Sequence, residues 1–171
     1  MTSDTAFARP SEGATPYGRP RAFETIVYGG LAVGVLDISD AILFWWLRNG
    51  VSPTRILQSV ASGLLGAAAF EGGTKTALLG LLLHFLIAFI VVAVYYGASL
   101  RFPQLVRRAV VWGLLYGVAV YFVMNYVVLP LSAFPQRPAS FALAPFLNGV
   151  IGHALFVGLP VALIARHSAK K

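Results

Sequence analysis

Residues 76–100, TALLGLLLHFLIAFIVVAVYYGASL, form an apolar stretch without a single Asp, Glu, Lys or Arg. A helix needs roughly 20 such residues to cross the hydrocarbon core of a bilayer. This stretch therefore predicts a transmembrane helix. Three other stretches reach a similar length, so that the four predicted spans are residues 26–46, 76–100, 109–131 and 147–165.

The composition points to the same class of protein. Hydrophobic residues make up 58% of the 171 residues and charged residues only 11%, which is far from the balance of a soluble domain. The net charge of +7 comes from 13 basic residues that are spread between the apolar stretches and never form one face. We therefore expect the lipid bilayer, and no nucleic acid, as their partner. The absence of cysteine excludes disulfides and thiolate chemistry.

A shorter helix is predicted between the first two spans. Ser52 is a suitable N-cap, Pro53 fits the first helical position, and the pair Gly72 and Gly73 is expected to end the helix after about 17 residues. Ser62 and Gly66 are small residues four apart, a spacing that favours packing against another helix. The fold class is therefore an all-α integral membrane bundle of four transmembrane helices plus one short interfacial or re-entrant helix, although a fifth span over residues 54–70 stays open.

The ends of the chain differ from its middle. Residues 1–22 are rich in Pro, Gly, Ser and Thr and lack apolar periodicity, so we expect a disordered cytoplasmic tail. Residues 23–166 form the predicted transmembrane domain, and residues 167–171 form a basic C-terminal tail.

The distribution of basic residues predicts the orientation. Cytoplasmic segments of membrane proteins carry an excess of Lys and Arg. Four spans with both termini inside place nine basic residues in the cytoplasm and four outside, so we expect a multi-pass membrane protein with both termini in the cytoplasm. The inside set is Arg9, Arg19, Arg21, Arg101, Arg107, Arg108, Arg166, Lys170 and Lys171, and the outside set is Arg48, Arg55, Lys75 and Arg137.

Two carboxylates interrupt the first span. Asp37 and Asp40 are three residues apart and so share one face of the predicted helix, and the Gly30 and Gly34 spacing leads onto that face. A charged group at the bilayer centre costs about 3 kcal/mol, so such residues need partners, protonation or a water-filled cavity. We therefore expect both side chains to face the interior of the bundle.

The other spans carry polar residues at a similar depth. At about 1.5 Å per residue, Asp40, Asn125 and His153 each lie roughly 9 Å below the outer end of their span, and His84 roughly 12 Å. This common depth predicts a polar intramembrane cluster in the outer half of the bundle. Its predicted members are Asp40, His84, Asn125 and His153, with Asp37 and Tyr121 about one turn deeper.

The second half of the chain resembles the YagU-type family of small bacterial inner-membrane proteins, a domain of unknown function. The resemblance rests on GLLLHFLIAFIVVAVYY from residue 80, GLLYGVAVYFVMNYVVLPL from residue 113 and NGVIGHALFVGLPVALIAR from residue 148. It includes His84, the Gly113 and Gly117 pair and the Gly152 and His153 pair. It implies an inner-membrane location and four spans, but no mechanism, and it does not extend to the first span.

Several functions fit this pattern. The first hypothesis is proton or ion handling by the polar cluster within a homo-oligomer or a larger membrane complex, because carboxylate and imidazole groups together can relay protons. The cofactor is unknown, and an alternative is a haem- or metal-binding subunit, with His84, His153 and Asp40 as candidate ligands. A structural or assembly subunit is the other alternative. No enzyme is expected, since the chain lacks nucleophile-elbow, P-loop and dinucleotide-binding motifs.

Overall fold

The computed structural model describes residues 17–135 and 142–170, and these residues are almost entirely helical, with no strand among them. The elements follow in chain order. They are η1 (Glu24–Tyr28), α1 (Gly29–Asn49), α2 (Pro53–Leu65), η2 (Gly66–Phe70), α3 (Gly73–Arg101), α4 (Gln104–Arg107), α5 (Ala109–Val123), η3 (Met124–Val128), α6 (Leu129–Leu131), α7 (Leu143–Gly152), η4 (His153–Gly158) and α8 (Leu159–Ser168).

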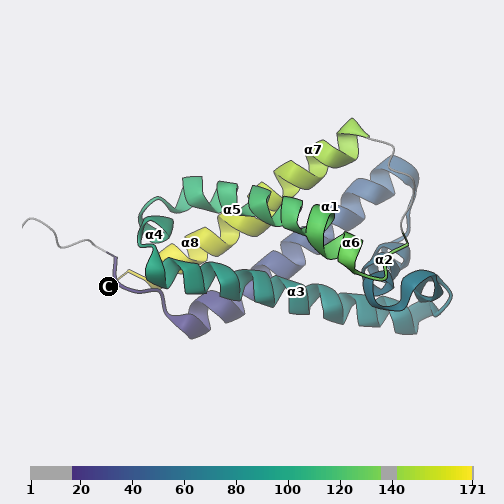
Figure 1. Cartoon of the computed structure of the whole chain (residues 1–171), viewed down its shortest axis with the longest axis horizontal. Coiled ribbons are helices and arrows are strands. Elements are labelled where there is room, and N and C mark those ends of the chain that lie inside the picture. The colour runs from purple at the N-terminus through teal and green to yellow at the C-terminus, as the bar shows by residue number, and fades with distance from the viewer. Residues whose placement is uncertain (1–16, 136–141, 171) are drawn as a thin grey trace, which may run out of the picture.

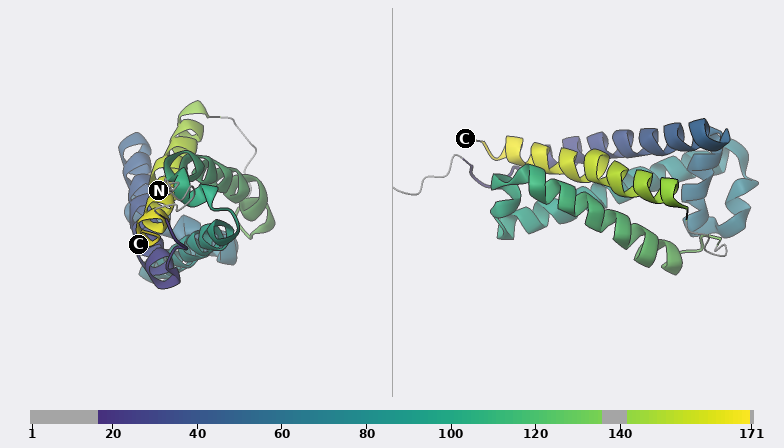
Figure 2. Two further views of the ribbon diagram at one scale, coloured as in Figure 1. Left: turned by 90° about the vertical axis from the view of Figure 1, so that its left-hand side faces the viewer. Right: turned by 90° about the horizontal axis from the view of Figure 1, so that it is seen from above.

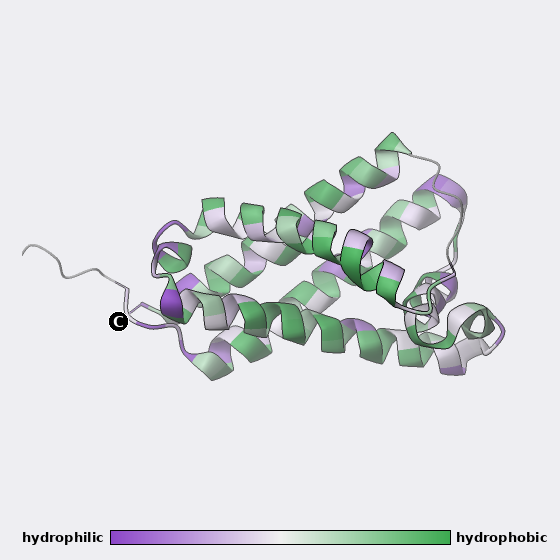
Figure 3. Cartoon of the chain, viewed as in Figure 1, coloured by the Kyte–Doolittle hydropathy of each residue, from purple (hydrophilic) through white to green (hydrophobic). Residues whose placement is uncertain are grey.

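Four continuous helices are long and apolar enough to cross a membrane, which confirms the predicted fold class. They cover Glu24–Asn49, Gly73–Arg101, Ala109–Leu131 and Leu143–Ser168. The four run side by side as a bundle, and apolar residues predominate along their length while polar residues gather at the two ends (Figures 1 and 3). The chain is therefore a multi-pass membrane protein.

The outer surface of the bundle is apolar. Along α3, for example, Leu82, Leu86 and Ile90 expose 62%, 55% and 54% of their surface. Leu78 and Val94 continue the same exposed face of this helix. A contiguous apolar surface of this length would aggregate in water, so it is explained by contact with lipid chains.

The short helix α2 lies at the end of the bundle opposite the termini and crosses the bundle axis there (Figures 1 and 2). The predicted start is confirmed, because the Ser52 side chain accepts a hydrogen bond from the Arg55 amide and Pro53 is the first helical residue. The predicted end is wrong. The α-helix stops at Leu65, since Gly66 adopts φ 62° and a 3₁₀ turn follows, so the expected helix of 17 residues is divided in two.

Small residues allow the helices to approach closely. A Cβ atom added to Gly113 would lie 2.7 Å from the Ala162 Cβ and 2.8 Å from the Gly158 carbonyl oxygen, which joins α5 to the fourth span by backbone contact. Gly30 and Gly34 instead receive the rings of Phe89 and Phe85 from α3. These glycines therefore serve internal packing. Ser62 is also fully buried, so the small residues of α2 are used within the chain.

The core fills the half of the bundle that is nearer the termini. Its buried residues are Val33, Ala88, Val92, Tyr95, Ala109, Val157, Val161, Ala162 and Ala165. Two tyrosines tie helices together there, because the Tyr95 hydroxyl donates to the Leu105 carbonyl at 2.9 Å and the Tyr116 hydroxyl donates to the Val91 carbonyl at 2.6 Å. We call this region the inner half of the bundle.

The segment before the first span is attached to the last helix, which corrects the expectation of a disordered tail up to residue 22. The Gly18 amide donates to the Ala169 carbonyl at 2.7 Å, and the Arg166 guanidinium donates to the Tyr17 hydroxyl. The Thr25 hydroxyl also lies 2.9 Å from the Ser168 hydroxyl in a buried contact. Residues 1–16 of the predicted tail lie outside the described residues.

Candidate functional site

The half of the bundle farther from the termini, which we call the outer half, contains a cavity of about 630 Å³. Side chains from all four spans and from α2 line this cavity, and most of them are apolar. The polar and ionisable lining residues are Asp37, Arg55, Ser59, His84, Asn125, Ser132 and His153. Four of the six predicted cluster residues therefore share one cavity.

Asp37 and His153 are the central pair of this cavity. The Asp37 Oδ1 atom lies 3.9 Å from the His153 Nδ1 atom, and the two side chains expose 24% and 21% of their surface. The distance is longer than a direct hydrogen bond but within ion-pair range. The expected contact between a carboxylate of the first span and an imidazole of the fourth span is therefore present.

Asp40 lies outside the cavity lining, contrary to the expectation that it would be level with His84, Asn125 and His153. Its Oδ2 atom instead accepts a hydrogen bond of 3.0 Å from the Asn148 amide on α7. Depth is not the reason, because the first span also extends three residues further than expected, to Asn49, and Asp40 lies beside Gly152, the neighbour of His153. The two carboxylates differ in what they face: Asp40 faces Gly152 and Asn148 of α7, whereas Asp37 faces His153 and the cavity.

Gly152 makes room for the Asp40 carboxylate. A Cβ atom at residue 152 would lie 2.7 Å from the Asp40 Oδ2 atom. Gly152 and Asn148 are on the same face of α7, so one face of this helix supplies both the space and the hydrogen-bond donor for Asp40. The role of Asp40 in the structure is to connect α1 with α7.

His84 connects the second span to the first. Its Nε2 atom lies 2.8 Å from the Gly34 carbonyl oxygen. A carbonyl oxygen can only accept, so the imidazole donates through a protonated Nε2 atom in this contact. His84 thus combines a structural hydrogen bond with a position in the cavity wall.

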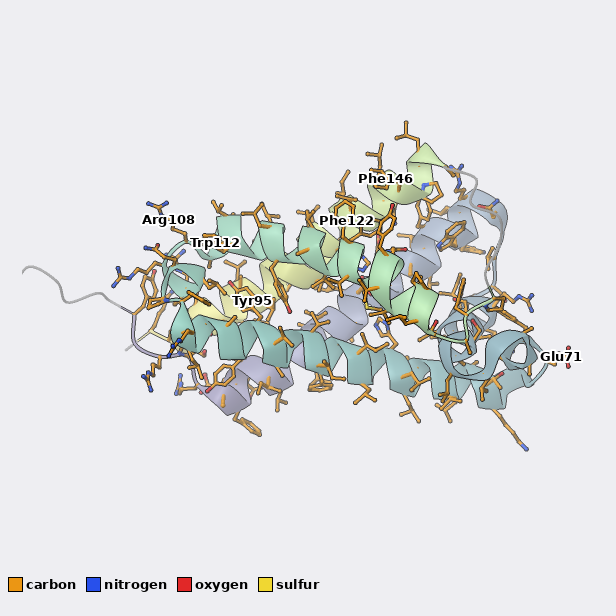
Figure 4. All side chains as sticks on the ribbon, viewed as in Figure 1. Glu71, Tyr95, Arg108, Trp112, Phe122 and Phe146 are labelled. Carbon is orange, nitrogen blue, oxygen red and sulfur yellow. The ribbon has the colours of Figure 1, made fainter. Side chains whose placement is uncertain are left out.

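Asn125 and Tyr121 come from the third span and differ in their surroundings. Asn125 lines the cavity, and its amide donates to the Tyr121 carbonyl at 2.9 Å within the same helix. Tyr121 is buried and does not line the cavity. Its ring instead packs edge-on against the His153 ring, with 5.5 Å between ring centres, and against Phe146 of α7, which Figure 4 labels.

Two of the polar cavity residues lie in π-helical turns. Asn125 belongs to η3 (Met124–Val128), and His153 is the first residue of η4 (His153–Gly158). A π-helical turn widens the helix locally and interrupts its regular hydrogen bonding, and such turns are frequent at functional sites. The sequence analysis did not predict these turns, because hydrophobic periodicity does not distinguish one wide turn within a long apolar helix.

The sequence also did not predict the residues that form the outer wall of the cavity. Arg55, Ser59 and Gly63 come from α2, and Ser132 and Phe134 follow the third span. Arg55 is exposed, and its guanidinium carbon lies 4.0 Å above the centre of the Phe70 ring, in a cation-π contact. The sequence placed Arg55 in the predicted short interfacial or re-entrant helix on the outer side, but no pattern indicated which residues of that helix would line a cavity.

The candidate metal ligands do not form a ligand set. Among the residues that the structure describes, no group of three or more His, Asp or Glu side chains is placed to hold a metal ion. Asp40 is directed to Asn148, and His84 donates to a carbonyl oxygen. The observed arrangement is instead a pair of ionisable groups in a largely apolar wall.

No protein-family model, curated protein or solved structure matches this chain. The resemblance to the YagU-type family is neither supported nor contradicted by these comparisons. The function must therefore be argued from the cavity itself.

Proposed function

We propose that this multi-pass membrane protein is a proton-exchanging binding protein for a small lipophilic cation. The observation that carries the proposal is the Asp37 and His153 pair, 3.9 Å apart in the wall of an otherwise largely apolar cavity. The proposal narrows the hypothesis of proton or ion handling to one site and one class of ligand.

The chemistry of the pair explains why protons and cations exchange there. When His153 is protonated, the pair holds two opposite charges and is neutral overall. When His153 loses its proton, a single negative charge remains on Asp37 within apolar surroundings, and an uncompensated charge there is costly. A cationic ligand beside Asp37 removes that cost, so binding of the cation is coupled to release of the proton.

The rest of the cavity suits a lipophilic body. Val33, Ile38, Ile87 and Val157 are among the apolar residues of the wall, and a cavity of about 630 Å³ lies within the usual range for small-molecule sites. The other cation near the site, Arg55, is exposed at the outer end and rests on Phe70, so it is solvated and does not neutralise Asp37 directly.

The packed inner half supports one-sided exchange. Val92, Val161 and Ala165 are fully buried between the cavity and the termini, and Tyr95 and Tyr116 close the space between α3 and α5. A continuous path through the bundle would require this core to open. The proposal is therefore a binding site that is reached from the outer end rather than a channel.

Tetraphenylphosphonium is a suitable probe, because it is a lipophilic cation that cannot itself gain or lose a proton. When it is added to the purified protein in weakly buffered detergent solution, its binding should be saturable and should release protons. A pH-sensitive dye detects the released protons. Asp37→Asn should weaken binding at least about tenfold, as expected for the loss of one ionic contact in a partly buried site, and should abolish proton release.

Asp40→Asn is the matched comparison, because it removes the same charge from the same helix at a position outside the cavity wall. Asp40 lies within electrostatic reach of Asp37 and His153, so this variant should lose some affinity, but less than Asp37→Asn, and should still release protons on binding. Binding without proton release in the unmodified protein would contradict the exchange, and equal binding by the Asp37→Asn variant would contradict the role of the carboxylate.

We also propose that the protein lies in a bacterial inner membrane with both termini in the cytoplasm. The basic residues support this orientation. Seven of the described basic residues lie before the first span or at the α3 to α4 to α5 connection and the end of α8, which is the end of the bundle that holds the termini, and three lie at the end of α1, in α2 and at the start of α3, which is the α2 end. The first set is Arg19, Arg21, Arg101, Arg107, Arg108, Arg166 and Lys170, and the second is Arg48, Arg55 and Lys75.

Single cysteines provide the measurement for this orientation, since the chain has none of its own. A cysteine at Ser52 should react with a membrane-impermeant maleimide in intact cells, whereas a cysteine at Ala169 should react only after the membrane is permeabilised. The reverse pattern would show the opposite orientation.

A further inference from the structure

A second cavity of about 320 Å³ lies at the end of the bundle that holds the termini. It is separate from the outer-half cavity and shares no lining residue with it. Its wall combines the segment before the first span, the end of α3 and the connection through α4. The lining residues are Tyr17, Gly18, Arg19, Pro20, Ser99, Leu100, Pro103, Val106 and Arg107.

The charge of this second cavity is positive. Arg19 and Arg107 contribute two guanidinium groups, and none of the lining residues is acidic. Ser99 donates its hydroxyl hydrogen to the Tyr96 carbonyl at 2.6 Å, and the Tyr17 hydroxyl accepts from Arg166. The two arginines are therefore the charged donors that this wall offers to an anion, and arginine is well suited to phosphate oxygens.

The surrounding residues do not neutralise these arginines. Within the part of the chain that the structure describes, Glu24 is the one carboxylate near this end, and it forms an ion pair of 2.9 Å with Arg21. Arg101, Arg108 and Arg166 add further positive charge nearby, and Arg108 lies at this end in Figure 4. The field around the cavity therefore favours an anionic ligand.

The position of the cavity distinguishes a lipid headgroup from a free anion. Ser99 and Leu100 belong to the last turn of a membrane span, and Pro103 to Arg107 follow it directly. Phe102 and Trp112 expose 59% and 40% of their surface close by, as expected for aromatic residues at the headgroup level. Leu100, Pro103 and Val106 give the wall an apolar part, which would contact glycerol and acyl carbons but would not stabilise free phosphate.

We infer that this cavity binds the phosphate headgroup of an anionic phospholipid, with Arg19 and Arg107 holding the phosphate and Leu100, Pro103 and Val106 contacting the start of the acyl chains. Because Arg19 and the neighbouring Gly18 are held against α8 by the Gly18 to Ala169 hydrogen bond, the bound lipid would bridge the N-terminal segment and the α3 to α4 connection. This site is independent of the function proposed for the outer half.

The experiment is native mass spectrometry of the full-length protein with added phosphatidylglycerol, and with phosphatidylcholine and inorganic phosphate as alternative ligands. The unmodified protein should retain one phosphatidylglycerol more strongly than phosphatidylcholine. The double variant Arg19→Gln and Arg107→Gln should lower that affinity at least about twenty-five-fold, since each arginine would lose a direct charge-assisted hydrogen bond to the phosphate, which contributes a factor of about five or more.

The matched control is the double variant Arg101→Gln and Arg108→Gln, which removes the same charge at the same end from residues outside the cavity wall. Its affinity should fall by no more than about fivefold, because these two arginines act on the headgroup only through the general field, and both variants should be compared at equal thermal stability. An equal loss in the two double variants would overturn the site in favour of a diffuse positive surface. Equal affinity of the unmodified protein for the two lipids, displacement by millimolar inorganic phosphate, or no retained lipid would also overturn it.

Discussion

The inner and outer halves of the bundle are built from the same four spans but handle polar groups in opposite ways. In the inner half, the hydroxyls of Tyr95 and Tyr116 donate to backbone carbonyls of neighbouring segments, and the space between the helices is filled. In the outer half, Asp37 and His153 face a cavity and approach each other only to 3.9 Å. In the outer half His84 and Asp40 also connect helices, but only this half has an ionisable pair that lines an open space.

Glycine placement explains the difference. Gly113 and Gly158 bring α5 into backbone contact with the fourth span in the inner half. Toward the outer end the third span contains the π-helical turn Met124–Val128 and Pro130, and its end at α6 diverges from α7, which stays beside α1 (Figures 1 and 2). The space that opens there is covered by α2 rather than filled by side chains. The cavity therefore results from the divergence of the helices and not from small side chains in its wall.

The largest effect is expected from a methyl group added at the inner-half contact. In Gly158→Ala the new Cβ atom would meet the backbone of Gly113 and Gly117, including the Gly117 Cα at 2.7 Å, and backbone cannot move aside locally. We expect the free energy of unfolding to fall by about 3 kcal/mol. Thermal unfolding in detergent, followed by circular dichroism, measures this change.

Gly97→Ala is the control for that variant, because a Cβ atom there meets nothing within 4 Å. It should leave stability unchanged or raise it by up to about 1 kcal/mol, as alanine favours helix over glycine. Equal destabilisation by the two substitutions would show that the inner half is not closely packed, and the contrast between the halves would disappear.

The fold could be predicted from the sequence because the apolar stretches are long and because a helix cap depends only on neighbouring residues. The third span was predicted at 109–131 and is observed at Ala109–Leu131, and the Ser52 cap depends only on neighbouring residues. Which polar residues share the cavity was harder to predict from the sequence. Depth alone could not separate Asp37 from Asp40, because the two carboxylates differ in the neighbours that they face: Asp37 faces His153 and the cavity, and Asp40 faces Gly152 and Asn148 of α7.

Other parts of the site had no local signal. Arg55 reaches the cavity because α2 packs on α3, where the Gly80 backbone approaches the Leu57 carbonyl. That contact joins residues of two helices through a turn whose geometry depends on Gly66 and Gly73, both at positive φ. The attachment of residues 17–22 to α8 likewise needs the tertiary structure, since a segment rich in Pro and Gly resembles a tail in composition.

Asp40 gives the next largest expected effect and tests whether its polar contact is structural. In Asp40→Leu the Asn148 amide loses its acceptor at 3.0 Å and stays within the bundle without it, so the free energy of unfolding should fall by about 2 kcal/mol. Asp40→Asn retains an acceptor oxygen and should cost less than about 1 kcal/mol. Chemical unfolding in mixed micelles compares the two variants, and equal stability would mean that the Asn148 contact does not stabilise the bundle.

The smallest effect is expected for valine to alanine substitutions, which compare the packing of the two halves directly. Val92 is fully buried in the inner core, whereas Val60 of α2 lines the outer cavity. In a bilayer, helix association depends on packing contacts more than on burial from water, so the cost of removing two methyl groups depends on how many neighbours they touch. Val92→Ala should therefore lower the free energy of unfolding by about 1 kcal/mol, and Val60→Ala by less than about 0.5 kcal/mol. The same unfolding measurement gives the free energy change of both variants. If Val60→Ala lowered the free energy of unfolding as much as Val92→Ala, the outer half would be packed as closely as the inner half and would leave no space for a ligand.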